Sequence, residues 1–176
     1  MRNVLIAALA TLVLTGCGMF VLAKAERDAA GGKSAANSSE DVQFLRDLAH
    51  ANAAEIRSGR MVAEKAASPQ VREHAKQMVD AHTTRNKQAA TLAAARGVTL
   101  PDDVEPKREA QLRQLEALSG EALERAYAAQ QVRDHGEMLR TLERAAADAQ
   151  NTEVRELAKS ALPQVRKHLE AARGLR

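Results

Sequence analysis

The sequence predicts an all-α protein, a ferritin-like four-helix bundle with a long connection, itself able to hold a short helix, between helices 2 and 3. Of 176 residues, 45% are hydrophobic but only 2% are aromatic, a composition that favours helix over strand. Apolar residues recur at steps of three and four along four segments of about 22 to 28 residues. Tight turns pair these segments, and about 20 residues separate the pairs, as in a bundle with a crossover.

The first pair of helices is expected over about residues 40–66 and 69–96. Ser39 is a suitable N-cap for the first helix, because its hydroxyl can accept from a free backbone N–H. Ser68 and Pro69 mark the turn, with Ser68 as N-cap and Pro69 in the first helical position.

The second pair is expected over about residues 120–149 and 152–172, after a segment within residues 107–120 that could hold a short helix. Pro163 falls inside the last helix and predicts a kink there, because proline cannot donate the backbone hydrogen bond.

The N-terminal residues read as a targeting segment, with a lipoprotein signal peptide over 1–16, a lipidated cysteine and flexible tether over 17–39, and the bundle domain over 40–174. A basic residue precedes an apolar run that ends in Leu-Thr-Gly-Cys, which resembles the bacterial lipobox. That resemblance implies cleavage before Cys17 and acylation of Cys17 as a membrane anchor.

Gly18 follows this cysteine instead of aspartate, which in enterobacterial-type sorting implies passage to the outer membrane, with the domain facing the periplasm. The alternative is an uncleaved inner-membrane signal anchor, since residues 4–23 are about long enough to span a bilayer.

Charge and motifs exclude several classes of function. The net charge is +3, but acidic and basic residues are interleaved and aromatics are scarce, so nucleic-acid binding is not expected. The sequence has no phosphate-binding glycine loop, nucleophile elbow or HExxH motif, so it favours a non-enzyme unless a metal supplies the chemistry. It does not identify a protein partner.

One strongly polar residue lies on the apolar stripe of each long helix: Glu55, His82, His135 and His168. Glu55 and His82 lie about 12 and 15 residues either side of the first turn, so at 1.5 Å per residue they share a level. His135 and His168 lie about 15 and 18 residues either side of the second turn. The four side chains are therefore expected to converge at mid-bundle.

One carboxylate and three imidazoles on facing helices suit a four-coordinate divalent metal such as zinc, iron or copper. The pattern is not that of the di-iron carboxylate proteins, because valine stands three residues before each of these histidines where glutamate is needed. The residues expected to surround these ligands are Asn52, Met78, Gln131 and Asp134.

The alternative is a buried hydrogen-bonded network that fixes the register of the helices without a metal. His50 and His74 lie off this level and are expected at the surface or its boundary. Arg85 lies near the apolar stripe and is expected to extend its charge to solvent.

Four ordered blocks of the sequence resemble the bacterial domain of unknown function 4142 family, whose members are exported, ferritin-like helical proteins. The blocks are FLRDLAHANAAEI (44–56), VREHAKQMVDAHTTRN (71–86), AYAAQQVRDH (126–135) and ALPQVRKHLEAA (161–172). The resemblance covers about residues 40–174 and implies the fold and export, with Glu55, His82, His135, Pro163 and His168 at matching positions. His74 departs from the aromatic residue usual there. The family supplies no function.

Overall fold

The computed structural model of the protein describes residues 38–175, and its regular structure there is entirely helical. The helices are α2 (Ser39–Lys65), α3 (Pro69–Ala94), α4 (Pro106–Glu116), α5 (Gly120–Asp148) and α6 (Thr152–Arg173). This confirms the all-α prediction. None of these helices is long and apolar enough to cross a membrane. The expected signal peptide, Cys17 and all but the last residues of the tether lie outside the described residues.

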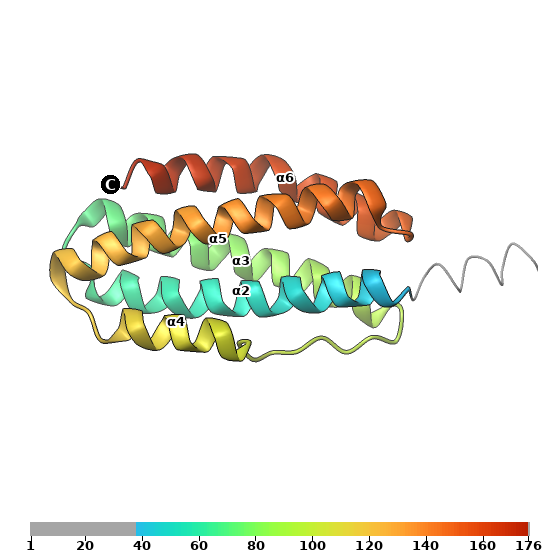
Figure 1. Cartoon of the computed structure of the whole chain (residues 1–176), viewed down its shortest axis with the longest axis horizontal. Coiled ribbons are helices and arrows are strands. Elements are labelled where there is room, and N and C mark those ends of the chain that lie inside the picture. Colours follow the sequence, from blue (N-terminus) through green and yellow to red (C-terminus); the bar gives the residue numbers. More distant parts are fainter. Residues whose placement is uncertain (1–37, 176) are drawn as a thin grey trace, which may run out of the picture. The chain divides into compact units, whose positions relative to one another are not determined.

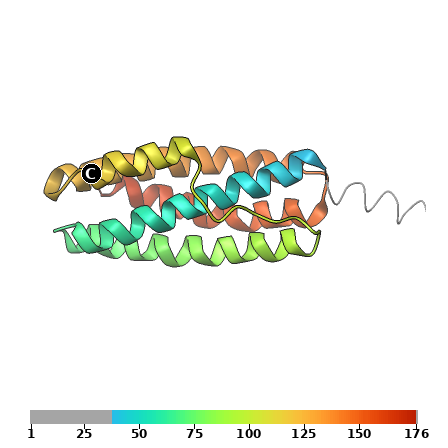
Figure 2. The ribbon, with the colours of Figure 1, turned by 90° about the horizontal axis from the view of Figure 1, so that it is seen from below.

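The four long helices lie side by side in two antiparallel hairpins, α2 with α3 and α5 with α6 (Figure 1). The chain leaves α3 at one end and runs back along the molecule through residues 95–105 and α4, as Figure 2 shows from below. The connection between the hairpins is therefore a lengthwise crossover, and α3 and α5 point the same way. The expected short helix is α4, which lies along α2.

Side-chain caps begin three of the long helices. The cap of α2 is Ser38 and not Ser39 as predicted, because the extended backbone of Ser38 lets its hydroxyl accept from the N–H of Asp41 at 3.1 Å. Ser68 caps α3 as expected. Asn151 caps α6, where its side-chain oxygen accepts from the first N–H groups of the helix. Helix α6 continues through Pro163 without a break.

Asp41 fastens the start of α2 to the turn between α5 and α6. Its carboxylate is 3% exposed and accepts from the backbone N–H groups of Gln150 at 3.2 Å and Asn151 at 2.8 Å. Charge-assisted hydrogen bonds of this kind are stronger than neutral ones. The two hairpins are thus joined at this end by a buried carboxylate.

The apolar core is divided into two clusters. The larger cluster joins the first half of α2 with the later parts of α3 and α5 and most of α6, and includes Leu45, Leu48, Leu142, Val154 and Val165. The smaller cluster lies at the other end and consists of Val62, Ala66, Val71, Ala75, Leu115, Leu123 and Tyr127. On α2, α3 and α5, buried polar residues occupy the stretch between the two clusters.

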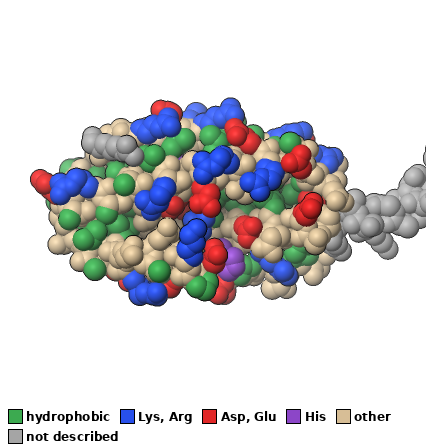
Figure 3. Space-filling model, viewed as in Figure 1, with side chains coloured by type: hydrophobic (Ala, Val, Ile, Leu, Met, Phe, Trp, Pro, Cys, Tyr) green, Lys and Arg blue, Asp and Glu red, His purple; other side chains and the backbone are tan. Residues whose placement is uncertain are grey.

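Charged residues form no region of one sign on the face that Figure 3 shows. Figure 3 shows acidic and basic side chains mixed across the face that carries α2, α4 and α5. This mixture agrees with the interleaving seen in the sequence.

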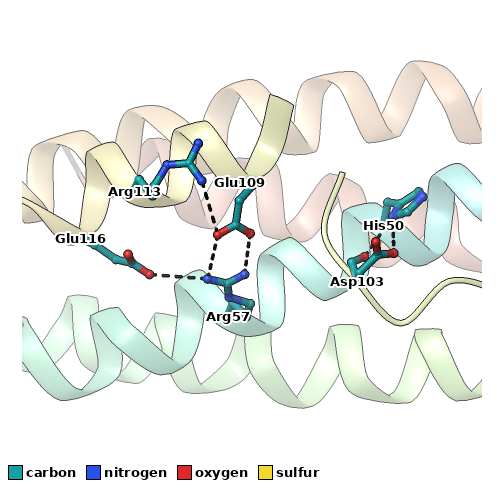
Figure 4. Close-up of polar contacts among 6 residues, drawn as sticks. All are labelled: His50, Arg57, Asp103, Glu109, Arg113 and Glu116. Carbon is teal, nitrogen blue, oxygen red and sulfur yellow. Dashed lines mark hydrogen bonds and ion pairs between the residues drawn. The ribbon is translucent and has the colours of Figure 1, made fainter. Parts of the chain in front are cut away.

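Exposed ion pairs hold the crossover against α2 (Figure 4). Arg57 on α2 contacts Glu109 at 2.6 Å and Glu116 at 3.6 Å, both on α4. His50 Nδ1 lies 2.9 Å from the backbone oxygen of Asp103 in the connection. Solvent-exposed pairs contribute about 0 to 1 kcal/mol each, so α4 depends also on its buried Leu112 and Leu115.

Helices α2 and α3 lie very close together at Gly59, which is buried inside α2. A Cβ atom there would lie 2.8 Å from Val79 Cγ2 and 2.9 Å from the backbone oxygen of Ala75. The backbone oxygen cannot rotate away, so any larger residue must separate the two helices.

We therefore expect Gly59→Ala to lower the free energy of unfolding by about 1 to 3 kcal/mol, the cost of overpacking, although alanine favours helix over glycine. Gly136→Ala in α5 is the matched control, because its Cβ would meet only Arg140 Nη1 at 3.9 Å. The control is expected to gain about 0.5 to 1 kcal/mol. Denaturant unfolding followed by circular dichroism measures the free energy of unfolding of both variants. Changes of the same sign in the two variants would contradict the packing argument.

Candidate metal centre

Three histidines from three helices meet in the core between the two apolar clusters. His82 on α3, His135 on α5 and His168 on α6 each place one ring nitrogen within 4.8 Å of the others. Their ring centroids lie 5.5, 6.0 and 5.3 Å apart, so the rings form a nearly regular triangle. Counting from the turns predicted that these histidines would share a level, and the structure brings them together.

Hydrogen bonds on the outer side of two rings determine where their protons lie. His135 Nδ1 is 3.0 Å from the backbone oxygen of Gln131, which can only accept, so Nδ1 must carry the proton. His82 Nδ1 is 2.9 Å from Asn52 Oδ1, and with the amide in this orientation Oδ1 accepts and His82 Nδ1 carries the proton. In a neutral imidazole the remaining nitrogen, Nε2, then has a free lone pair.

These two Nε2 atoms face each other at 3.4 Å. With both lone pairs free, the contact is repulsive unless a cation lies between them. Two nitrogens bound to one tetrahedral zinc, each at about 2.0 to 2.1 Å, lie about 3.4 Å apart. The spacing of His82 and His135 is therefore that of two ligands of one metal ion.

Burial keeps the three rings neutral, which is the state that binds metals. It lowers the pKa of His135 to about 4 and that of His168 to about 3, and it holds the pKa of His82 well below its usual value. The positive charge of Arg85 lowers all three values further. His168 is 9% exposed, and its Nδ1 has no hydrogen-bond partner within residues 38–175.

Glu55 lies beside the histidines but is not one of the three residues whose ligand atoms converge. Its carboxylate is buried and accepts from Gln131 Nε2 at 2.7 Å, and the backbone oxygen of Gln131 in turn faces His135. Burial raises the pKa of Glu55, although the bond from Gln131 opposes the shift. Glu55 is thus connected to His135 through one glutamine.

The other expected neighbours take different positions. Asn52 and Gln131 contact a histidine directly, as described above. Asp134 is buried beside His135 in the sequence, and burial together with the charge of Glu55 raises its pKa to about 6. Met78 is 1% exposed and lies one turn before His82 on α3.

A small space of about 10 Å³ adjoins Glu55, His82 and His135. Its other lining residues are Ala51, Arg108, Asp134 and Met138. These four residues also line a surface hollow of about 490 Å³ between α2, α4 and α5. The side of the cluster that carries Glu55 and Asp134 therefore faces α4. Arg108 on α4 lines both the small space and the surface hollow. No pattern in the sequence pointed to Arg108, because α4 has no fixed place until the crossover is known.

Two expectations about residues near the histidines are wrong. His74 is not at the surface but 5% exposed, because the Tyr127 ring of α5 packs against it with the hydroxyl 3.5 Å from Nδ1. Its spacing of two turns from His82 was the signal that could have shown this. Arg85 does not reach solvent: it is 3% exposed, and both terminal nitrogens are buried. His50 is half-buried at the boundary, as expected.

Comparison with known proteins assigns a family. Residues 26–175 match the family described as domain of unknown function (DUF4142). The chain belongs to the DUF4142 family. No curated protein matches this DUF4142 chain. A crystal structure of a DUF305 fragment from Deinococcus radiodurans is similar in fold, with a TM-score of 0.70 and 19% identity over 78% of this chain and 95% of that fragment.

The lowered histidine pKa values predict a loss of stability in acid for the metal-free DUF4142 protein. Below its ordinary pKa of 6.5 a histidine in the unfolded chain takes up a proton, whereas His135 and His168 in the folded chain do so only near pH 4 and 3. The unfolded state then binds more protons, so the free energy of unfolding falls between about pH 6.5 and 4. Glu55 and Asp134, whose pKa values are raised, act in the opposite direction and offset part of the loss.

We expect His168→Leu to reduce this loss by up to about 1.4 kcal/mol per pH unit, the effect of one proton. Lys167→Gln, at the exposed neighbouring position, is the control and should keep the wild-type dependence. Urea unfolding across this pH range measures the difference. If the free energy of unfolding depends on pH equally in the wild type and in His168→Leu, His168 does not resist protonation.

Proposed function

We propose that this protein binds one zinc or copper ion through His82, His135 and His168, and that it handles metal in the cell envelope. The observation that carries the proposal is the pair of Nε2 atoms of His82 and His135 at 3.4 Å, each made an acceptor by the hydrogen bond on the far side of its ring. Fixed outer hydrogen bonds of this kind are what orient histidine ligands in metal sites.

The donor set favours zinc or copper over iron. Three neutral imidazoles offer nitrogen ligands, which suit zinc and copper, whereas carboxylate-rich sites suit harder ions. Three protein ligands leave a fourth position of a tetrahedral ion open. Glu55, held by Gln131, supplies a nearby negative charge that offsets part of the charge of the ion.

The cellular setting rests on the N-terminal sequence and on the crossover. The lipobox-like Leu-Thr-Gly-Cys and the polar tether support a domain attached through Cys17 to the outer membrane and facing the periplasm. The lengthwise connection between hairpins supports a ferritin-like bundle. We infer a non-enzymatic role in which the envelope domain holds the ion.

A second candidate function is a structural or interaction module without a metal. It is favoured by Asn52 Nδ2, which is buried and has no partner within the described chain. If the Asn52 amide is turned round, Nδ2 donates to His82 Nδ1, and His82 Nε2 then carries the proton and donates to His135 at 3.4 Å. The polar layer would then be a network that sets the helix register.

Metal loading separates the two functions. We expect the purified protein, loaded with zinc or copper and then dialysed, to retain one ion per chain by elemental analysis. The bound ion should raise the melting temperature, and a chelator should reverse the rise. His135→Ala is expected to weaken binding at least about 100-fold, because it removes a ligand.

His50→Gln is the control, since the half-buried His50 ring contacts Asp103 and is not part of the cluster. It should bind metal as the wild type does. A protein that retains no ion, with a melting temperature unmoved by chelator, would support the structural module and contradict the metal centre.

A further inference from the structure

Arg85 is the least satisfied charged group in the core. It lies one turn after His82 on α3 and is 3% exposed, and neither Nη1 nor Nη2 has a hydrogen-bond partner within residues 38–175. Burying an unpaired charge costs several kcal/mol. A side chain kept in this state is positioned to bind a negatively charged group.

The groove beside Arg85 has room for such a group. It lies between α3 and α6, has a volume of about 590 Å³, and is lined by both Arg85 and His168. The other polar lining residues are Gln77, Asp80, Thr84, Gln88, Ser160 and Gln164. All six are exposed, so their side chains can rotate on a nanosecond timescale to admit a ligand. Asp80 is the one acidic residue of this lining.

The charges around the histidines also call for an anion once a metal is bound. Three neutral imidazoles add no negative charge to a divalent ion, and Arg85 adds a positive one that already lowers the pKa of every histidine in the cluster. Glu55 and Asp134 can offset at most two of these three positive charges, so the site keeps a net positive charge once the ion is bound. An anion on the open position of the ion would lower this repulsion.

The shape of the guanidinium favours an anion with two oxygens on one central atom. Its N–H groups form a planar fork that matches two oxygens on one carbon, as in carboxylate or carbonate. We propose that the groove between α3 and α6 binds a small planar oxyanion, a carboxylate or bicarbonate, through Arg85, and that this anion completes the coordination of the ion held by the three histidines. The completion of the metal coordination rests on the proposed metal function, whereas the binding of the anion by Arg85 does not.

Two measurements on the full-length protein in detergent test the proposal. The first is zinc affinity, by competition with a chromophoric chelator, in millimolar acetate, bicarbonate, chloride or perchlorate at one ionic strength. We expect acetate or bicarbonate to tighten binding about tenfold over perchlorate. Chloride, which cannot match the fork, should do less. The anion that acts shows whether the source is an organic acid or bicarbonate.

The second measurement follows the side-chain ¹⁵N signals of Arg85 in the metal-free protein, where acetate or bicarbonate should shift them. Arg85→Met keeps the packing of the stem and should bind zinc equally in all four anions. Arg85→Gln is a second variant with the same expectation. Lys87→Gln removes the same charge from an exposed position on α3 and should keep the wild-type anion dependence.

Zinc binding that ignores the anion, with unmoved Arg85 signals, would overturn this site and leave the metal centre intact. Shifted Arg85 signals without zinc binding would support the anion site and contradict the proposed metal function. A lack of both responses would overturn both proposals.

Discussion

The hydrogen bonds behind the imidazole rings determine how the helices are aligned. Asn52 on α2 meets His82 on α3, and Gln131 on α5 meets both His135 and Glu55. Alanine-rich surfaces tolerate sliding by a turn, because one small apolar side chain packs much like another. Directional bonds to buried polar groups do not tolerate it, since each lost partner leaves an unsatisfied group in a dry core. The polar layer therefore sets the register within one hairpin and between the two.

The same burial prepares the rings for chemistry. A histidine in water near neutral pH is partly protonated and must lose a proton before it binds a metal. In this core desolvation has already removed that proton, and the three rings lie with their centroids 5.3 to 6.0 Å apart. Desolvation lowers the stability of the metal-free protein in acid. It also keeps the imidazoles neutral, and so able to bind a metal, at neutral pH.

Much of this architecture follows from periodicity and turn chemistry. The step of three and four residues locates the helices, Ser68 and Pro69 locate a turn, and counting from the turns places three histidines at one level. The residues around these histidines depend on which helices face each other. That pairing cannot be read from the sequence of any one helix. The burial of His74 by α5, the enclosure of Arg85 and the position of Arg108 over the cluster arise from the crossover and from hairpin pairing. The cap at Ser38 differs by one residue because two serines compete for it.

The pairing of Tyr127 with His74 has a practical consequence. The chain contains one tyrosine and no tryptophan, so its near-ultraviolet absorbance and intrinsic fluorescence arise almost entirely from this side chain. Tyr127 is fully buried and precedes His135 on the same helix by eight residues, about 12 Å of axial rise. That separation is short enough for a coloured ion such as copper(II) to quench the ring by energy transfer. The protein thus carries a single such chromophore, which reports on the packing of one end of the bundle and would report on a coloured ion bound by the three histidines.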